Sequence, residues 1–218
     1  MILKIFVSIL KSKMNLIDSL IQKKVLKTKR IIKAFRKIKR KDFLPQDLKS
    51  SANLNKPLPI GEGQTISQPL VVAFMLELLK PEKGDKVLDV GSGSGYTSAL
   101  LSQLVGSEGK VIAIEIKPNL KEFGEKNNSK YGFVREGRVK FICGDGSKGC
   151  KKEASFDRIL CSAAVQNKIP KAWKKQLKIK GRIVTSIKSS IHLLVKESKD
   201  DFEVEKYPGF AFVPLKEK

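Results

Sequence analysis

The fold of this chain is decided by residues 87–96, which read Val-Leu-Asp-Val-Gly-Ser-Gly-Ser-Gly-Tyr. A short apolar run leads into a loop with glycine at every second position, and a helical pattern of apolar residues follows over 96–101. Glycine allows the chain to reverse sharply and leaves backbone uncovered for a ligand. The first N–H groups of the next helix point into the same space. The stretch therefore predicts a strand, a tight turn and a helix around a ligand.

The spacing of the glycines indicates which cofactor this loop holds. A dinucleotide fingerprint reads Gly-x-Gly-x-x-Gly, but Tyr96 stands at the place of the third glycine, which argues against NAD. The series Asp-x-Gly-x-Gly-x-Gly over 89–95 instead resembles the loop that binds S-adenosyl-L-methionine (AdoMet) in class I methyltransferases. Glu115 ends the next apolar run, where a carboxylate can accept hydrogen bonds from both ribose hydroxyls. The alternative is a glycine-rich turn without a ligand.

Strand and helix patterns alternate through the rest of the chain. Apolar strand patterns lie at 111–114, 139–143, 156–161 and 182–187, and helical patterns lie at 120–131 and 172–177. The alternation predicts an α/β fold with a doubly wound, mostly parallel sheet of the Rossmann-like class I methyltransferase type. Shorter runs at 192–196, 202–206 and 210–213 predict strands that finish the sheet antiparallel.

Two aspartates stand next to predicted strands. Asp145 lies between Gly144 and Gly146, after the strand over 139–143, where its carboxylate can accept a hydrogen bond from an adenine amino group. The alternative for Asp145 is a turn-forming role between glycines. Asp157 stands early in its strand, and we expect it to be structural.

The N-terminal part of the domain is basic and helical. Apolar residues recur at helical spacing over 16–21 and 31–38, and Thr28 is the expected N-cap of the second helix. Eleven Lys or Arg residues and no acidic residue lie between Asp18 and Asp42. Any face that these helices leave exposed is therefore strongly positive.

We expect one domain of ordinary size with an N-terminal extension. The extension is 1–13, and the domain, 14–218, divides into a basic helical part (14–60), a cofactor-binding core (61–190) and C-terminal strands (191–218). The opening apolar run contains Lys4 and ends at Lys11, so it is too short to span a bilayer. No small-residue cleavage site follows it, which argues against a signal peptide. No stable membrane insertion is expected, with a helix on a membrane surface as the alternative.

The formal net charge of +22 raises nucleic acid as a partner. Aromatic residues do not interleave with the lysines as they do in single-strand binders, and basic residues recur over 148–152 and 168–180. We therefore expect loose attraction to acidic partners, and no specific nucleic-acid site. The expected state is a monomer.

The chain has three cysteines, Cys143, Cys150 and Cys161. An odd number without a Cys-x-x-Cys pair or a nearby histidine argues against a metal site and for a reduced, cytoplasmic protein. Cys143 and Cys161 end apolar strand patterns, where a buried thiol that acts as a small hydrophobe is expected.

Ser67 precedes a helical pattern that begins near Leu70 and stops before Pro81. It is the expected N-cap of that helix, with Pro69 in the first turn, where a proline is tolerated. On local grounds, Ser67 is structural.

Several motifs together resemble the protein-L-isoaspartate O-methyltransferases. They are Arg40-x-x-Phe43-x-Pro45, Gly-x-Gly-Gln-Thr-Ile-Ser-Gln-Pro over 61–69, the glycine loop, Gly144-Asp145-Gly146 and Phe-Val-Pro-Leu over 212–215. The resemblance covers about 14–215, and Gly-Gln-Thr-Ile-Ser is the discriminating motif. It implies methyl transfer from AdoMet to the α-carboxylate of L-isoaspartyl residues in damaged proteins and peptides. The methyl ester then collapses to a succinimide that reopens partly to aspartate.

The resemblance also implies roles for individual residues. Ser67 takes the place of the active-site serine, and Thr65 and Ile66 join it in binding the substrate. Glu115 binds the ribose, and Asp145 and Gly146 contact the adenine. The cofactor loop is formed by Asp89, Gly91, Gly93 and Gly95.

The expected reaction needs no general base, which agrees with the lack of a recognisable catalytic triad in the sequence. A substrate carboxylate with a pKa of about 4 is ionised at neutral pH, so no general base is needed. The chain has one histidine, His192, and no catalytic triad can be argued. Catalysis then depends on aligning carboxylate oxygen, methyl carbon and sulfonium and on excluding water. The Ser67 hydroxyl, beside free helix N–H groups, is suited to hold the carboxylate.

This chain departs from the family pattern in its late strands. The family usually shows Gly-Gly-Arg, Pro-Val-Gly and then a glutamine, where Lys180-Gly181-Arg182, Ser186-Ile187-Lys188 and His192 stand here. Ala211 replaces an arginine of many members. The departures bear on peptide affinity more than on AdoMet binding. Two alternatives stay open, a class I methyltransferase that acts on RNA and a non-catalytic AdoMet-binding relative. Against the first, Cys161-Ser162-Ala163-Ala164 replaces the Asn/Asp-Pro-Pro-Tyr/Phe motif of amino-methylating enzymes.

Overall fold

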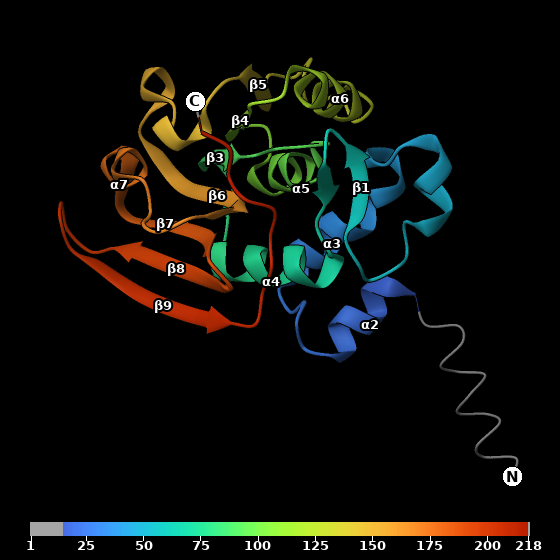
Figure 1. Cartoon of the computed structure of the whole chain (residues 1–218), viewed down its shortest axis with the longest axis horizontal. Helices are drawn as coiled ribbons and strands as arrows, with labels where there is room; N and C mark the ends of the chain where they lie inside the picture. The colour runs from blue at the N-terminus through green and yellow to red at the C-terminus, as the bar shows by residue number, and fades with distance from the viewer. Residues whose placement is uncertain (1–14, 218) are drawn as a thin grey trace, which may run out of the picture.

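The computed structural model describes residues 15–217, and the expected extension, 1–13, lies outside them. The centre of the molecule is a seven-stranded sheet with the order β5-β4-β3-β6-β7-β8-β9 (Figure 1). Its strands are β3 (Lys86–Val90), β4 (Lys110–Glu115), β5 (Val139–Cys143), β6 (Phe156–Val165), β7 (Leu177–Ile187), β8 (Ser190–Lys196) and β9 (Phe202–Pro208). Neighbours from β5 to β7 pair parallel, and β8 and β9 pair antiparallel. The expected mostly parallel sheet with an antiparallel finish is confirmed.

Helices surround this sheet, and a small hairpin stands apart from it. The helices are α2 (Leu16–Gln22), α3 (Lys29–Lys37), α4 (Pro69–Leu79), α5 (Tyr96–Val105), α6 (Pro118–Ser129) and α7 (Lys171–Gln176). Short 3₁₀ helices are η1 (Arg40–Phe43), η2 (Gln46–Ser51), η3 (Gly146–Lys148) and η4 (Lys151–Glu153). The hairpin consists of β1 (Leu58–Gly61) and β2 (Gln64–Ile66). None of the helices in the described part of the chain is long and apolar enough to cross a membrane.

The central strands are buried on both faces, which is why they read as nearly continuous apolar runs. Side chains that alternate along β3 and β4 enter two different apolar clusters. Val87 and Val111 belong to the larger cluster, which contains the buried faces of α3, α4 and α5. Leu88 and Ile112 belong to the second cluster, with the fully buried Trp173 of α7. The sheet is therefore covered from both sides.

Strand β3 lies where the strand order reverses, because β4 and β5 extend from one of its sides and β6 from the other. In open α/β sheets this is the place where a ligand crevice forms, at the carboxyl ends of the strands. The glycine loop begins directly after β3. The topology thus places the predicted cofactor loop at the switch point of the sheet.

Two expected elements differ from the structure. The predicted strand at 210–213 is wrong, because the segment after β9 runs back across the middle of the sheet and makes an isolated parallel bridge between Ala164 and Pro214 (Figure 1). Leu215 N–H donates to Ala164 O, and Ala164 N–H donates to Val213 O, both at 2.8 Å. The β1–β2 hairpin was not predicted from the sequence.

The N-terminal end of α4 is not capped by Ser67, so that prediction is wrong. The N-cap residue is Gln68, whose side chain makes no capping bond. Asn55 supplies the cap from a distance, since its Oδ1 accepts a hydrogen bond from Leu70 N–H at 3.0 Å. Gln68 Nε2 donates in return to Asn55 O at 2.9 Å. The start of α4 is therefore fixed by the preceding loop.

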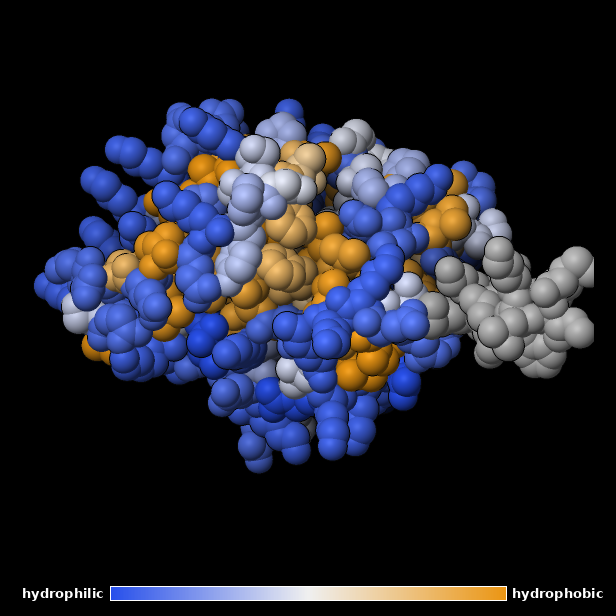
Figure 2. Space-filling model, turned by 90° about the horizontal axis from the view of Figure 1, so that it is seen from below, coloured by the Kyte–Doolittle hydropathy of each residue, from blue (hydrophilic) through white to orange (hydrophobic). Residues whose placement is uncertain are grey.

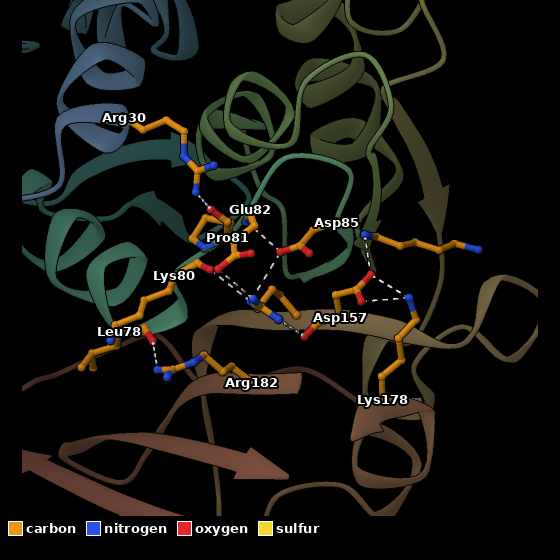
Figure 3. Close-up of polar contacts among 11 residues, drawn as sticks. Arg30, Leu78, Lys80, Pro81, Glu82, Asp85, Asp157, Lys178 and Arg182 are labelled. Carbon is orange, nitrogen blue, oxygen red and sulfur yellow. Dashed lines mark hydrogen bonds and ion pairs between the residues drawn. The ribbon is translucent and has the colours of Figure 1, made fainter. Parts of the chain in front are cut away.

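The C-terminal end of α4 is held by three arginines from other elements (Figure 3). Arg182 Nη1 donates to Leu78 O at 2.9 Å, Arg158 Nε donates to Lys80 O at 3.1 Å, and Arg30 donates to Pro81 O. Cations at this end of a helix satisfy carbonyl groups and oppose the negative pole of the helix dipole. Both ends of α4 are thus tied to the body of the protein.

Two smaller expectations were partly right. Thr28 is the N-cap residue of α3, but its hydroxyl makes no capping bond and donates instead to Glu77 Oε2 of α4 at 2.7 Å. Cys161 is buried as expected, and burial raises the pKa of its thiol to about 12. Cys143 is exposed, because it ends the edge strand β5 and has no further strand beside it. No cluster of side chains suited to a metal ion occurs within 15–217.

Candidate functional site

Most of the predicted site residues meet in one pocket at the carboxyl ends of β3 and β4. The pocket contains about 780 Å³ of unfilled space, counted with its mouth open to solvent. Its walls come from the glycine loop, the β1–β2 hairpin, the loop after β5 and the C-terminal segment. The predicted residues that line it are Thr65, Ile66, Ser67, Gly91, Gly93, Glu115 and Gly146. Asp89, Gly95 and Asp145 do not line it.

Glu115 is a buried carboxylate in this wall, with 5% of its surface exposed. Its Oε2 accepts a hydrogen bond from Gly93 N–H at 2.9 Å, and its Oε1 accepts one from Lys117 N–H at 3.0 Å. A carboxylate offers about four acceptor positions, so both oxygens can accept further bonds from a ligand. Glu115 therefore holds the glycine loop in place and presents acceptors to the pocket.

The three glycines of the loop are required for different structural reasons. All three have positive φ, with values of 70° at Gly91, 51° at Gly93 and 82° at Gly95. A Cβ on Gly95 would lie 2.5 Å from Asn128 Nδ2, which donates to Gly95 O at 3.0 Å. Gly95 is therefore required for the close packing of α6 against the loop, whereas Gly91 and Gly93 border the pocket.

Asp89 lies beneath the loop and is fully buried. Its Oδ2 accepts hydrogen bonds from Thr97 Oγ1 at 2.9 Å and Ser98 Oγ at 2.6 Å, in the first turn of α5. Burial raises the pKa of the carboxyl group to about 6, against the lowering effect of these two hydroxyls. Asp89 thus orients the helix that follows the loop and does not itself line the pocket.

The loop after β5 is fixed by tight packing. A Cβ on Gly146 would lie 2.5 Å from Val90 Cγ1, and Trp173 Nε1 donates to Gly146 O at 2.8 Å. Asp145 Oδ1 accepts hydrogen bonds from the N–H and the hydroxyl of Ser147, at 2.9 and 2.7 Å. The carboxylate of Asp145 therefore shapes its own turn, which favours the turn-forming alternative. Gly146 is the member of the pair that borders the pocket.

Ser67 lies in the wall that separates the pocket from a second, outer groove. The groove is lined by Pro57, Thr65, Ser67, Gln68, Val71, Ser162, Gly209, Phe210, Ala211, Phe212 and Val213. None of these residues is charged, in a protein with net charge +22. Phe210 of the groove stacks on Phe74 with ring centroids 5.3 Å apart. Seen from below, the molecule shows apolar side chains gathered in the middle of its surface with hydrophilic side chains around them (Figure 2).

The backbone of Ser67 is anchored by Arg40, whose side chain is buried. Its guanidinium donates to Ser67 O at 3.3 Å and to the carbonyl oxygens of Ala52, Leu54 and Lys56 at 3.0, 3.2 and 2.9 Å. Arg40 thereby ties the loop before the hairpin to the segment before α4. In the sequence, Arg40 is marked only by the motif Arg40-x-x-Phe43-x-Pro45, and its basic neighbours give no sign that its side chain is buried.

The β1–β2 hairpin closes one side of the pocket. Ile60 Cδ1 lies 3.1 Å from the position that a Cβ on Gly93 would take, so the hairpin packs directly on the glycine loop. At the tip, Glu62 Oε1 accepts a hydrogen bond from Asn119 Nδ2 at 2.8 Å, and Glu62 Oε2 pairs with Lys117 Nζ at 3.2 Å. The Asn119 and Lys117 bonds lower the pKa of Glu62 below its usual range. The tip is thus fastened to the start of α6.

The residues present fit a nucleoside-type cofactor such as AdoMet. Glu115 offers acceptors for ribose hydroxyls, and Gly91, Gly93 and Gly146 leave backbone uncovered. Ser92 also lines the pocket, and its buried hydroxyl has no hydrogen-bond partner among the described residues. A buried polar atom without a partner is costly, so this hydroxyl fits a polar group of a ligand. Val90 and Ile114 supply apolar wall between these polar groups.

Comparisons with known proteins indicate one family. The family model described as protein-L-isoaspartate(D-aspartate) O-methyltransferase matches residues 11–218. A protein-L-isoaspartate O-methyltransferase of Methanopyrus kandleri is 42% identical over 194 residues, which cover 87% of this chain and 84% of that protein. A protein of the same name from Ignicoccus hospitalis is 38% identical, with 93% and 96% covered.

Solved structures give the same result for the fold. A protein-L-isoaspartate O-methyltransferase superposes with a TM-score of 0.81 at 28% identity, over 91% of this chain, and the chain spans 64% of that protein's length. A Plasmodium falciparum protein described as such an enzyme, in complex with S-adenosyl-L-homocysteine, has a TM-score of 0.83 at 20% identity, with 94% and 100% covered. The match of the family model over nearly the whole length shows that this chain belongs to the protein-L-isoaspartate(D-aspartate) O-methyltransferase family.

Proposed function

We propose that the pocket binds AdoMet, that the outer groove binds a peptide with an L-isoaspartyl residue, and that the two meet at Ser67. One observation carries this proposal. Thr65, Ser67, Ser162 and Val213 line both the pocket and the groove. A methyl donor in one and a carboxylate in the other would approach each other at this shared wall. This is the geometry that the family's reaction, methyl transfer from AdoMet to isoaspartyl carboxylates, requires.

On the cofactor side, five residues of the pocket have roles in binding. AdoMet supplies an electrophilic methyl group on a sulfonium centre. Glu115 accepts hydrogen bonds from the ribose hydroxyls, and Gly146 borders the adenine. Gly91 and Gly93 allow the ligand to approach the backbone, and Ser92 offers its unpartnered hydroxyl to a polar group of the cofactor.

The substrate side needs alignment and no base. An isoaspartyl carboxylate is ionised at neutral pH, since its unperturbed pKa is about 4. His192 lies in β8, opposite Thr185 and Lys206, and does not line the pocket or the groove. Ser67 donates its hydroxyl to the carboxylate, Thr65 and Ile66 complete the wall, and the hairpin excludes water. The rate of methyl transfer thus depends on how the substrate carboxylate is oriented toward the methyl group.

The groove indicates how this chain meets the residues that flank the isoaspartate. Of the positions that depart from the family pattern, Ala211 lines the groove, whereas Ser186, Lys188 and His192 do not. The proposal is therefore that Ala211 changes contact with the peptide and that the other departures act on the sheet alone.

The proposal is tested by incubating the protein with methyl-labelled AdoMet and paired peptides that differ only in Asp and isoAsp. We expect label only in the isoAsp peptide. Glu115→Gln should weaken AdoMet binding by about 1–3 kcal/mol, since a carboxylate acceptor is lost, whereas the exposed Glu108→Gln should leave binding unchanged. Calorimetric titration with NAD should show no binding. Equal labelling of both peptides, or unchanged AdoMet affinity in Glu115→Gln, would contradict these assignments.

The proposal also covers the oligomeric state, the location and the nucleic-acid binding of the protein. The protein acts as a monomer in the cytoplasm, in line with its three unpaired cysteines, and has no specific nucleic-acid partner. Nucleic-acid binding should then be weak, unselective and lost near physiological salt. A tight complex with one class of RNA, methylated on incubation, would support the alternative of an RNA methyltransferase. The extension, 1–13, is proposed to be dispensable for turnover.

A further inference from the structure

A second cavity lies among the N-terminal helices and is separate from the cofactor pocket. It contains about 1240 Å³ of unfilled space, counted with its open mouth. Residues of α2, α3, η1 and η2 line it. Of the residues that the structure describes, Tyr96 at the start of α5 is the one that lines both this cavity and the cofactor pocket. Nothing in the reaction described above uses this space.

The walls of the cavity are basic on one part and apolar on another. The cations that line it are Arg36, Lys39, Arg40, Lys41 and Lys49, and no acidic residue of the described chain lines it. Arg36 pairs with Asp18 at 3.3 Å, outside the lining. Phe35 and Tyr96 contribute aromatic surface, with their rings edge to face at 6.4 Å. The cavity therefore has an excess of positive charge beside an aromatic wall.

The positive charge of Arg40 is energetically costly in this cavity, because 94% of the surface of this residue is removed from solvent. All its contacts through Nη1 and Nη2 are to neutral carbonyl oxygens, and its Nε has no partner. Buried charges in proteins are ordinarily paired with an opposite charge. Within 15–217 no carboxylate bonds to Arg40. Residues 1–14 contain no Asp or Glu in their sequence.

We propose that this cavity binds a small organic phosphate. A phosphate monoester carries close to two negative charges at neutral pH and several acceptor oxygens, which suit a site with several Lys and Arg side chains. A single carboxylate would leave most of the five cations uncompensated. The organic part of the ligand lies against Phe35 and Tyr96, and the phosphate lies among Lys41, Lys49 and Arg36, near the guanidinium of Arg40.

The test uses the full chain, saturated with S-adenosyl-L-homocysteine so that the cofactor pocket is blocked. Phenyl phosphate is titrated at 0.15 M salt by calorimetry, about physiological ionic strength, with phenol as the uncharged analogue that keeps the aromatic ring and lacks the phosphate. We expect saturable binding of one phenyl phosphate and at least about ten-fold weaker binding of phenol. Lys41 and Lys49 are not buried, so the double variant Lys41→Gln/Lys49→Gln should fold. Its affinity for phenyl phosphate should fall about ten-fold or more.

The matched control is Lys33→Gln/Lys37→Gln, which removes the same charge from exposed positions of α3 that do not line the cavity. Its affinity should stay within about three-fold of the wild type, because only long-range and screened attraction is lost. Equal losses in the two double variants would show diffuse attraction to the basic surface and overturn the proposal. Absence of saturable binding up to about 10 mM, or equal affinity for phenol, would overturn it as well.

Discussion

Asn55 Oδ1 accepts a hydrogen bond from Leu70 N–H at 3.0 Å, and this bond between a loop and α4 does the capping that local sequence rules assign to Ser67. The stability of the helix start and the chemistry at the shared wall therefore belong to different residues. Substitutions can separate them.

Asn55→Ala should lower the free energy of unfolding by about 0.5–2 kcal/mol, the usual cost of a lost cap. Ser67→Ala should change it by less than about 0.5 kcal/mol, since Ser67 makes only a backbone contact with Arg40. Turnover should behave in the opposite way. Ser67→Ala should reduce kcat/KM for isoaspartyl peptide about 10–100-fold, the value of one hydrogen bond to a charged group.

Urea unfolding and initial-rate kinetics on both variants measure this separation. Ser67→Asp is the stricter form, because a second negative charge would face the substrate carboxylate. It should fold, bind AdoMet and fail to methylate. If Ser67→Asp turns over like the wild type, Ser67 has no part in the reaction.

The tip of the hairpin should control how fast the cofactor product leaves. Glu62 bonds to Asn119 and Lys117 at the start of α6, and its ion pair with Lys117 is partly exposed. Glu62→Gln should therefore speed the release of S-adenosyl-L-homocysteine by about 2–5-fold, as expected for one exposed ion pair. Stopped-flow displacement with excess AdoMet gives the rate. Glu122→Gln, at an exposed position of α6, is the control and should not change it. Unchanged release from Glu62→Gln would show that the tip does not limit exit.

Glu153 should make stability depend on acid pH. Its carboxylate pairs with Lys86, Lys110 and Lys140 at 3.3, 3.4 and 3.0 Å, and the Lys140 bond is the largest of the effects that lower its pKa to about 2. The unfolded chain has the ordinary value of about 4.5. Its contribution is therefore present above pH 4.5 and is lost as the pH falls toward 2. We expect about 1–2 kcal/mol after screening by salt.

Glu153→Gln removes this contribution at every pH. Its stability deficit against the wild type should be full at pH 6 and should vanish near pH 2, as followed by urea unfolding across this range. Glu108→Gln, at an exposed position, should show no such convergence. A deficit that stays constant with pH would mean that the ion pairs are not its source.

Gly95 and Gly137 offer a comparison of backbone strain with steric contact. Both have positive φ, 82° and 71°, but a Cβ on Gly137 would meet nothing within 4 Å, whereas one on Gly95 would meet Asn128 Nδ2 at 2.5 Å. Each substitution by alanine costs about 1 kcal/mol through φ, and Gly95→Ala should cost about 1–3 kcal/mol more through overpacking. Chemical unfolding of the two variants measures the difference. Equal losses of stability in the two variants would show that α6 can shift away from the glycine loop.

The parts of the fold that follow from local periodicity were predicted well. The strands around the glycine loop and the positions of Glu115 and Gly146 are set by apolar runs and the residues that end them. Short segments were not, because β1 and β2 span four and three residues, too few for a period to be seen. The segment at 210–213 has an apolar pattern, yet its extended backbone pairs at one bridge only.

Contacts between distant residues could not be read from the sequence. Nothing near Asn55 indicates that it caps a helix that starts fourteen positions later, and Arg40 is one of eleven basic residues in its segment. Asp89 and Asp145 are both part of sequence motifs that predict cofactor binding. In the folded chain, however, the carboxylate of Asp89 bonds to Thr97 and Ser98, and that of Asp145 bonds to Ser147. A motif fixes which residues recur, and only packing fixes what each one touches.

The two fastened ends of α4 determine which changes of length the chain can accept. The helix has eleven residues, so it spans about 16 Å between the cap from Asn55 and the arginines at Leu78 and Lys80. Inserting or deleting one residue would turn one end about 100° relative to the other and break one set of anchors. The turn between β8 and β9 has no such constraint. Relatives should therefore differ in length at this turn and keep the length of α4 unchanged.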